Sequence, residues 1–281
     1  MSVLISLWLS HSVSFAAGFV PPPPGTLYTS PTGARLRLIP AGTFDQGCAP
    51  GADCESASSP AVPVTLRNPL WMMEREVTQE QYQRLMKDNP SAFRRCGGDC
   101  PVEQVTWTDA ARYANRLSES EGLAACYVEL DGRITWESGP ACAGYRLPTE
   151  AEWEWAARAG ADAASSAELV GFMRGWFIEN SEKQPQAVAG KAPNAWGLRD
   201  MVGNVSEWVW DGYAAYVPDP VTDPTGRGAG GFRVTRGGSW TSSRGKTTVF
   251  TRVGADIGTR NYDLGFRLVR TCTGPTDPLS M

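Results

Sequence analysis

Histidine is almost absent from this sequence of 281 residues. The single histidine, His11, lies in an apolar stretch close to the N-terminus, so the body of the chain contains none. Ser-His and Cys-His nucleophile pairs both need a histidine base, and many zinc and iron sites need histidine ligands. The body of the protein therefore has none of these sites.

Clusters of basic residues are also lacking. The formal net charge is −4, and the 26 lysines and arginines are scattered along the chain. Binding to nucleic acid or to an anionic lipid surface requires a concentrated positive patch. We therefore expect neither of these partners.

Long apolar runs are restricted to the N-terminus, where Val3 to Phe19 is too short to span a bilayer comfortably. The stretch ends in small residues, as a cleavable secretory signal does. No lysine or arginine precedes Arg35, so the charged start of such a signal is missing. We expect residues 1–18 to be a signal peptide with a truncated start, and no stable membrane span. A disordered apolar N-terminus is the alternative.

Residues that interrupt regular structure are abundant: the chain has 30 glycines and 21 prolines, together with 11 tryptophans. This combination indicates a loop-rich fold packed around indole rings. No internal repeat or change of composition divides the chain. We expect a Pro-rich linker over residues 19–35, one domain over residues 36–273 and a tail over residues 274–281.

The seven cysteines fall mostly into close pairs, and Cys272 lies apart from them. Loop-type residues separate the members of each pair, so each pair can form a short disulfide in an oxidising compartment. The expected disulfides are Cys48 with Cys54, Cys96 with Cys100, and Cys126 with Cys142. A zinc cluster is the alternative, but Cys-x-x-Cys doublets and histidine ligands are both missing. We expect a secreted or periplasmic protein.

Three helices are predicted. Capping boxes at Thr78-Gln-Glu-Gln81 and Thr149-Glu-Ala-Glu152 open two of them, which end near Lys87 and Gly160. The other is expected from Asp109 to Ser118, with Thr108 as its N-cap. Arg146, which precedes the last helix, is expected to pair with a carboxylate.

Short strands are predicted before and after these helices. An alternating stretch that begins near Leu36 and turns before Phe44 predicts an N-terminal hairpin. Further strands are expected at Val62 to Leu66, Leu70 to Met73, Phe232 to Arg236 and Gly265 to Val269.

Seven stretches, taken together and in this order, resemble the formylglycine-generating enzyme (sulfatase-modifying factor) family. They are Glu76 to Tyr82, Pro101 to Trp107, Tyr145 to Arg158, Asn194 to Leu198, Val202 to Trp208, Arg236 to Trp240 and Leu264 to Arg267. The resemblance implies an α+β fold of the C-type-lectin-like kind. With the elements above, we expect an irregular, loop-rich domain with short antiparallel strands and about three helices.

The resemblance also implies a calcium site in the loop that begins at Asp200. Matched residue by residue, its ligands would be the side chains of Asp200 and Glu207 and the backbone carbonyls of Gly203 and Val205. Calcium takes about 6–8 oxygen ligands, which an irregular loop with two carboxylates can help to supply. The alternative is a capped turn in which Glu207 forms an ion pair at the surface.

The enzymes of this family oxidise a substrate cysteine by means of two cysteines that bind copper(I). The matching positions here are Ser242 and Thr247. Copper(I) prefers soft thiolates over hydroxyls, so copper is not expected. Lys246 is the only local candidate for a base that could activate Ser242, and the favoured interpretation is that both hydroxyls are solvated groups in a vestigial cleft.

Two functions remain open for this sequence. The first is a non-catalytic, calcium-stabilised binding or scaffold module that binds a peptide, glycan or protein. Its cleft residues would be Trp240, Ser242, Arg244, Lys246 and Phe250. The alternative is an extracytoplasmic oxidase of the same family, similar either to relatives in siderophore maturation or to the formylglycine-generating enzyme. Whether catalysis remains is open at this point.

Overall fold

The computed structural model describes residues 22–48, 58–161, 170–226 and 231–272. The expected signal peptide, the expected tail and Cys54 lie outside the described residues. Within the described ranges, no helix has the length and apolar character needed to cross a membrane.

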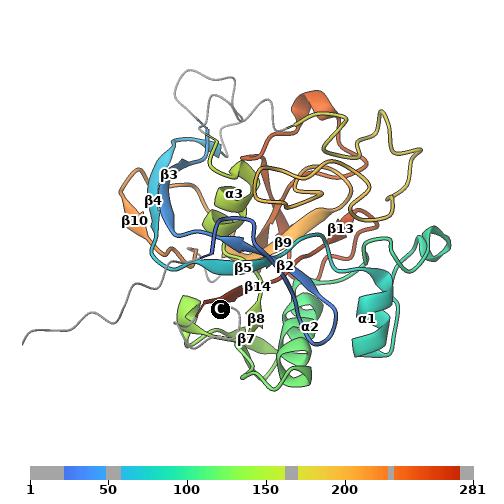
Figure 1. The fold of residues 1–281 in the computed structure, drawn as a ribbon, viewed down its shortest axis with the longest axis horizontal. Helices are drawn as coiled ribbons and strands as arrows, with labels where there is room; N and C mark the ends of the chain where they lie inside the picture. Colours follow the sequence, from blue (N-terminus) through green and yellow to red (C-terminus); the bar gives the residue numbers. More distant parts are fainter. Residues whose placement is uncertain (1–21, 49–57, 162–169, 227–230, 273–281) are drawn as a thin grey trace, which may run out of the picture.

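The described part of the chain has the expected α+β, loop-rich architecture, with three α-helices and short strands (Figure 1). The helices are α1 (Gln79–Met86), α2 (Trp107–Ser120) and α3 (Glu150–Arg158). The capping boxes predicted for α1 and α3 are confirmed. The predicted start of α2 is wrong by two residues, because Thr106 rather than Thr108 forms a capping box with Asp109.

The N-terminal and C-terminal strands pair in one five-stranded sheet. Its order is β1 (Leu27–Thr29), β2 (Arg35–Ile39), β5 (Leu70–Met73), β14 (Val269–Thr271) and β8 (Tyr145–Arg146). Because β1 pairs with β2, the folded domain includes part of the stretch expected to be a linker.

The predicted N-terminal hairpin is wrong. Strand β3 (Gly42–Gln46) leaves the first sheet and pairs with β4 (Val62–Leu66), which pairs in turn with β10 (Val221–Thr222). The prolines at positions 40 and 63 do not prevent this second sheet, in which β3 and β4 are antiparallel.

A four-stranded sheet carries the C-terminal half of the domain. Its order is β12 (Arg252–Asp256), β11 (Phe232–Arg236), β9 (Ser206–Gly212) and β13 (Leu264–Gly265). The strand predicted over 265–269 is in fact two strands, β13 and β14, that belong to different sheets. Strands β6 (Val128–Leu130) and β7 (Arg133–Thr135) form a separate hairpin.

Short 3-10 turns and two disulfides complete the described elements. The turns are Arg94–Cys96, Gly139–Ala141 and Arg244–Lys246. The disulfides Cys96–Cys100 and Cys126–Cys142 are confirmed. The expected partner of Cys48 lies outside the described residues.

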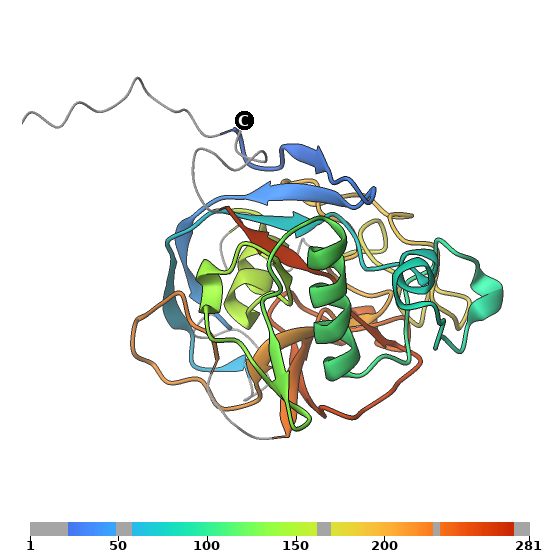
Figure 2. The ribbon, with the colours of Figure 1, turned by 90° about the horizontal axis from the view of Figure 1, so that it is seen from below.

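Aromatic side chains fill the core, as the composition predicts. Helices α1 and α2 lie side by side (Figures 1 and 2), where Tyr82 stacks on Tyr113 with ring centroids 5.4 Å apart. Phe266 packs edge-on against both rings. Around α3, a second cluster contains fully buried Trp153 and Phe177.

Charged side chains are buried around α3 as ion pairs. Glu154 lies between Arg158 and Arg236, with oxygen–nitrogen distances of 2.6 and 2.5 Å. Arg146 binds Glu152 through two hydrogen bonds of 2.7 Å, so the expected carboxylate partner of Arg146 is confirmed. Removing one member of such a buried pair costs about 3–5 kcal/mol, because the other charge stays buried without compensation.

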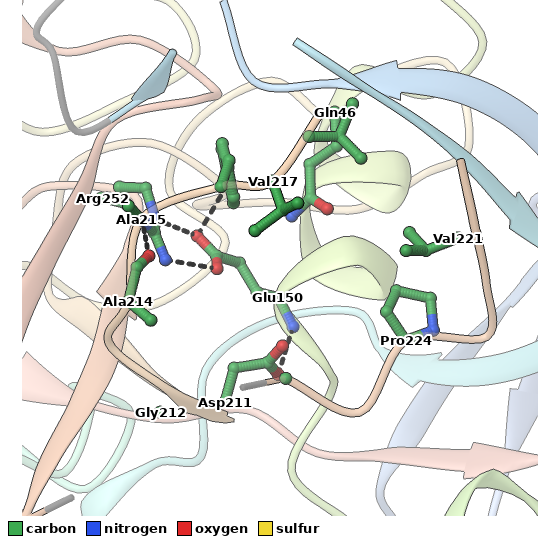
Figure 3. A pocket seen from close by; sticks show the side chains of 13 residues that line it. Gln46, Glu150, Asp211, Gly212, Ala214, Ala215, Val217, Val221, Pro224 and Arg252 are labelled. Carbon is green, nitrogen blue, oxygen red and sulfur yellow. Dashed lines mark hydrogen bonds and ion pairs between the residues drawn. The ribbon is translucent and has the colours of Figure 1, made fainter. Parts of the chain in front are cut away.

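The N-terminus of α3 forms one wall of a small pocket with a volume of about 80 Å³ (Figure 3). Arg252 donates to both oxygens of Glu150 at 2.6 and 2.8 Å. The backbone N–H of Glu150 donates to Asp211 Oδ2 at 2.7 Å. Burial, followed by the charge of Glu150, raises the pKa of Asp211 to about 8.

This pKa predicts how stability changes with pH. Between the ordinary pKa of an aspartate, about 4, and about 8, the native state keeps a proton on Asp211 that the unfolded state has released. The free energy of unfolding should therefore fall as pH rises from 5 to 8, by up to about 1.4 kcal/mol per pH unit. Asp211→Asn keeps an acceptor for Glu150 and cannot ionise, so it should flatten this dependence and be more stable than the wild type at pH 8.

Urea denaturation at pH 5, 6, 7 and 8 measures the effect, with Asp219→Asn at an exposed position as the control. If the wild type and Asp211→Asn lose stability in parallel over this range, Asp211 is not the group responsible.

Candidate functional site

The loop that follows β11 brings the two predicted hydroxyls together. Gly237 and Gly238 turn the chain with φ values of +89° and +66°. A Cβ on Gly238 would lie 3.3 Å from Ser242 Oγ and 3.2 Å from Thr247 Oγ1. Both hydroxyl oxygens therefore border the space above Gly238, which only a glycine leaves open.

Both hydroxyls take part in local hydrogen bonds. Ser242 Oγ accepts from the backbone N–H of Ser239 at 3.0 Å, and Thr247 Oγ1 donates to the carbonyl of Ser243 at 2.9 Å. In the described part of the chain, neither hydroxyl is hydrogen-bonded to a lysine or a carboxylate, and Lys246 is exposed. Neither oxygen has the neighbouring base that a nucleophile requires.

The loop that carries Trp240 and Ser242 contacts three other segments of the chain. Trp240 packs edge-on against Phe93 and lies at 5.6 Å, between ring centroids, from Tyr262. The backbone N–H of Ile178 donates to the carbonyl of Ser242 at 3.0 Å. The side chains of Ile178 and Tyr262 are 51% and 45% exposed.

The apolar surface continues beyond Ile178. Phe172 and Met173 are 47% and 75% exposed, and the guanidinium of Arg244 lies over the ring of Phe172. Glu179 anchors the same loop, since Ser243 Oγ donates to its carboxylate at 2.8 Å. We call this surface the apolar rim; it consists of Phe93, Phe172, Met173, Ile178, Trp240 and Tyr262.

The five residues predicted to line a cleft do not lie on one face. Trp240 belongs to the apolar rim, Ser242 and Arg244 contact it, and Lys246 is exposed on the 3-10 turn. Phe250 instead packs against the core cluster around α3. The sequence did not reveal that Phe93, residues 172–178 and Tyr262 contribute to this surface, because they are distant in the sequence and share no pattern.

The predicted calcium loop has a backbone of unusual shape. Asp200, Gly203 and Asn204 have φ values of +55°, +75° and +57°. The left-handed region is costly for most residues, although aspartate and asparagine tolerate it better than others. Gly203 also lies against the backbone of Trp176, where a Cβ would be 2.2 Å from the carbonyl oxygen.

Glu207, the last predicted ligand, is buried beside Arg267. Its carboxylate accepts from Arg267 Nε and Nη2, at 2.8 and 2.6 Å, and from Trp153 Nε1 at 2.8 Å. The remaining donors of Arg267 reach backbone carbonyls of β5 and of the loop at 199–200. Sequence reasoning missed this role of Arg267, although its Gly-Phe-Arg motif was recognised.

Asp200 lies against a second buried carboxylate, Glu76, that the sequence analysis did not single out. Asp200 Oδ1 and both carboxylate oxygens of Glu76 are buried and accept no hydrogen bond from other described residues, and the two carboxyl groups are placed to share a proton. Burial, and then the charge of Asp200, raises the pKa of Glu76 well above its ordinary value. Burial likewise raises the pKa of Asp200.

This region thus has more buried carboxylates than cations: Glu76, Asp200 and Glu207 lie near Arg267. Among the described residues, no three side chains of His, Cys, Asp or Glu are arranged to hold a metal ion. A cation bound here would have to take backbone carbonyls as further ligands. Calcium at this loop stays a prediction.

Comparison with known proteins places this arrangement in a family. A model of the sulfatase-modifying factor enzyme 1-like domain matches residues 28–272. Chaperone protein LppX of Paenibacillus barcinonensis is 32% identical over 229 residues, which cover 70% of this chain and 78% of that protein. The formylglycine-generating enzyme of Streptomyces coelicolor is 35% identical over 157 residues, covering 50% of this chain and 42% of the enzyme.

Among solved structures, Treponema denticola variable protein 1 superimposes with a TM-score of 0.74 and 34% sequence identity. The match covers 88% of this chain and 99% of that one. The family model covers most of the chain, and LppX matches it over most of both lengths. The chain therefore belongs to the family of sulfatase-modifying factor enzyme 1-like domains, which includes the formylglycine-generating enzymes.

Proposed function

We propose that this protein is an extracytoplasmic binding protein that holds apolar segments of another polypeptide and lacks copper-dependent formylglycine-generating activity. The observation that carries the proposal is the placement of Ser242 and Thr247 beside Gly238. The resemblance to the family assigns these two positions to its copper-binding cysteines, and hydroxyls are poor ligands for copper(I). Both hydroxyls border the space above Gly238, and neither can supply a thiolate.

The apolar rim supports a polypeptide as the ligand. Ile178, Phe172 and Met173 are about half exposed or more, and exposed apolar side chains that lie together favour a protein contact. Arg244 and Glu179 supply charged groups beside them. LppX, which matches this chain over most of its length, carries the name of a chaperone, in agreement with a role in binding other chains.

Two further observations agree with a location outside the cytoplasm. The disulfides Cys96–Cys100 and Cys126–Cys142 are of a kind that persists in oxidising compartments. The apolar stretch at residues 3–19 has the length of a secretory signal core.

The binding role is tested with a permanently unfolded probe, such as reduced and carboxymethylated lactalbumin. Burial of one large apolar side chain contributes about 1.5–3 kcal/mol, so Ile178→Asp should weaken binding by about tenfold or more. Fluorescence anisotropy of the labelled probe measures the affinity. Leu130→Asp, at an apolar position that is 72% exposed on another hairpin, is the matched control and should bind as the wild type does.

The proposal fails if the wild type does not bind the unfolded probe, or if Ile178→Asp and Leu130→Asp weaken binding equally. The second result would show that the contact is not made at the apolar rim.

We also propose that calcium stabilises the loop at 200–207. The buried oxygens of Glu76 and Asp200 that accept no hydrogen bond from other described residues support a cation here, because a cation would offset the excess of carboxylates. Oxygen ligands of this kind suit calcium, and the left-handed residues of the loop allow backbone carbonyls to contribute.

Chelation tests this second proposal. A ligand that binds only the native state stabilises it by mass action, so EDTA should lower the thermal midpoint by several degrees and added calcium should restore it. Asp200→Asn keeps an oxygen but removes a charge, and should raise the calcium concentration needed for half of the effect. If EDTA leaves the midpoint of the wild type unchanged, calcium has no part in the structure.

A further inference from the structure

A second surface feature lies away from the apolar rim. It is a groove with a volume of about 660 Å³ between the β6–β7 hairpin, the start of α2 and the strands β9 and β11. Figure 2 shows the hairpin alongside α2, to which a 2.6 Å ion pair between Arg112 and Glu129 connects it. Pockets for small ligands commonly have volumes of about 300–1,000 Å³, so the groove has a suitable size.

The groove lies at the opposite end of β11 from the Ser242 loop. Arg233 and Gly231 line it at the start of the strand, whereas Gly237 and Gly238 follow the end of the strand. Strand residues advance about 3.3 Å each, so the two features are on the order of 15 Å apart. A ligand in the groove would not touch Ser242 or Thr247.

Tryptophans form the floor of the groove. Trp210 lies 5.0 Å from Trp107 and 5.2 Å from Trp136, measured between ring centroids. Trp136 is nine-tenths buried, and its indole N–H has no hydrogen-bond partner within the described residues. A buried donor without a partner is costly in a folded protein, which points to a ligand or water that is needed to complete the site.

Arg233 lies over this floor, with its guanidinium carbon 4.2 Å from the centre of the Trp107 ring. Its Nη1 donates to the carbonyl of Trp210 at 2.9 Å, but its Nε is buried without a partner. Within the described structure, no carboxylate forms an ion pair with Arg233. Burial accordingly lowers the pKa of Arg233, because its charge is desolvated without full compensation.

The nearest acidic neighbour does not neutralise this charge. Asp211 influences Arg233 electrostatically, but the raised pKa of Asp211, about 8, keeps it mostly protonated at neutral pH. The described residues that line the groove include a second arginine, Arg133, and no aspartate or glutamate, although the carboxylate of Asp256 lies beside Gly231. In a protein of net charge −4, this is a locally positive site.

We propose that the groove binds an acidic saccharide, namely a sugar ring that carries a carboxylate, as a uronate does. Arginine recognises a carboxylate through paired hydrogen bonds, and the indoles that line the groove offer apolar contacts to a sugar ring. The hydroxyls of Thr108, Thr135 and Thr225 line the same groove and can bind sugar hydroxyls. These hydroxyls favour a uronate over an aromatic acid, because only the sugar offers several hydroxyl groups to bind them.

The test uses digalacturonate as the ligand, the matched neutral disaccharide galactobiose, and indole-3-acetate as the aromatic acid. Tryptophan fluorescence and saturation-transfer NMR measure binding to the full-length protein. Digalacturonate should bind at least tenfold more tightly than galactobiose. Arg233→Gln should weaken the binding of digalacturonate about tenfold or more, which corresponds to the loss of one charged hydrogen-bonded contact.

Arg95→Gln removes an exposed charge elsewhere and is the control, which should bind as the wild type does. Because Arg233 is half-buried, Arg133→Gln, on the exposed hairpin, serves as a second variant that does not depend on the core and should weaken binding about threefold or more. Equal affinity for the acidic and neutral sugars would overturn the proposal. So would undiminished binding by both arginine variants, binding of indole-3-acetate alone, or no binding at all.

Discussion

Glu154 is fully buried between Arg158 and Arg236, and its carboxylate also accepts the backbone N–H of Gly47 at 2.8 Å. This one carboxylate links α3, the end of β11 and the loop after β3. Much of the surrounding chain has no regular backbone hydrogen bonding, so its position depends on side chains such as these. An arginine satisfies several carbonyls at once through its five N–H donors, which explains why buried arginines accompany the loops.

Buried ion pairs of this kind also position the candidate site. Arg236 is bound to Glu154 and is followed directly by Gly237 and Gly238, beside which Ser242 and Thr247 lie. On the other side of β9, Arg267 holds Glu207 and the loop at 199–200. Neither ion pair involves the two hydroxyls. The scaffold can therefore be retained when the chemistry of the loop changes, which is the basis for proposing binding without copper-dependent oxidation.

Local signals in the sequence predicted much of the fold. The capping boxes at Thr78 and Thr149 depend only on residues three positions apart, and both are confirmed. Strand β9 was missed for two reasons. The residues just before it, Gly203 and Asn204, are typical of a loop, and the strand itself is defined only by its pairing with β11 and β13. Strand β3 pairs with β4 rather than with β2. This pairing depends on tertiary contacts, so no local sequence pattern predicts it.

The candidate site was predictable where a motif fixes spacing, and not where distant segments meet. Four residues separate Ser242 from Thr247, and the turn after Gly238 places both oxygens beside that glycine. Phe93, Ile178 and Tyr262 reach the same surface from three other segments. The carboxylate of Glu76 lay within a recognised motif, but only its burial beside Asp200 reveals it as part of the site.

The central claim is that hydroxyls occupy a site whose geometry would suit two thiolates. Copper(I) titration of the wild type and of the double variant Ser242→Cys/Thr247→Cys, monitored by competition with a chromogenic chelator, tests it most directly. The account predicts that the wild type takes no copper from the chelator and that the double variant binds one equivalent. Tight binding by the wild type would contradict the claim, and so would a folded double variant that binds no copper.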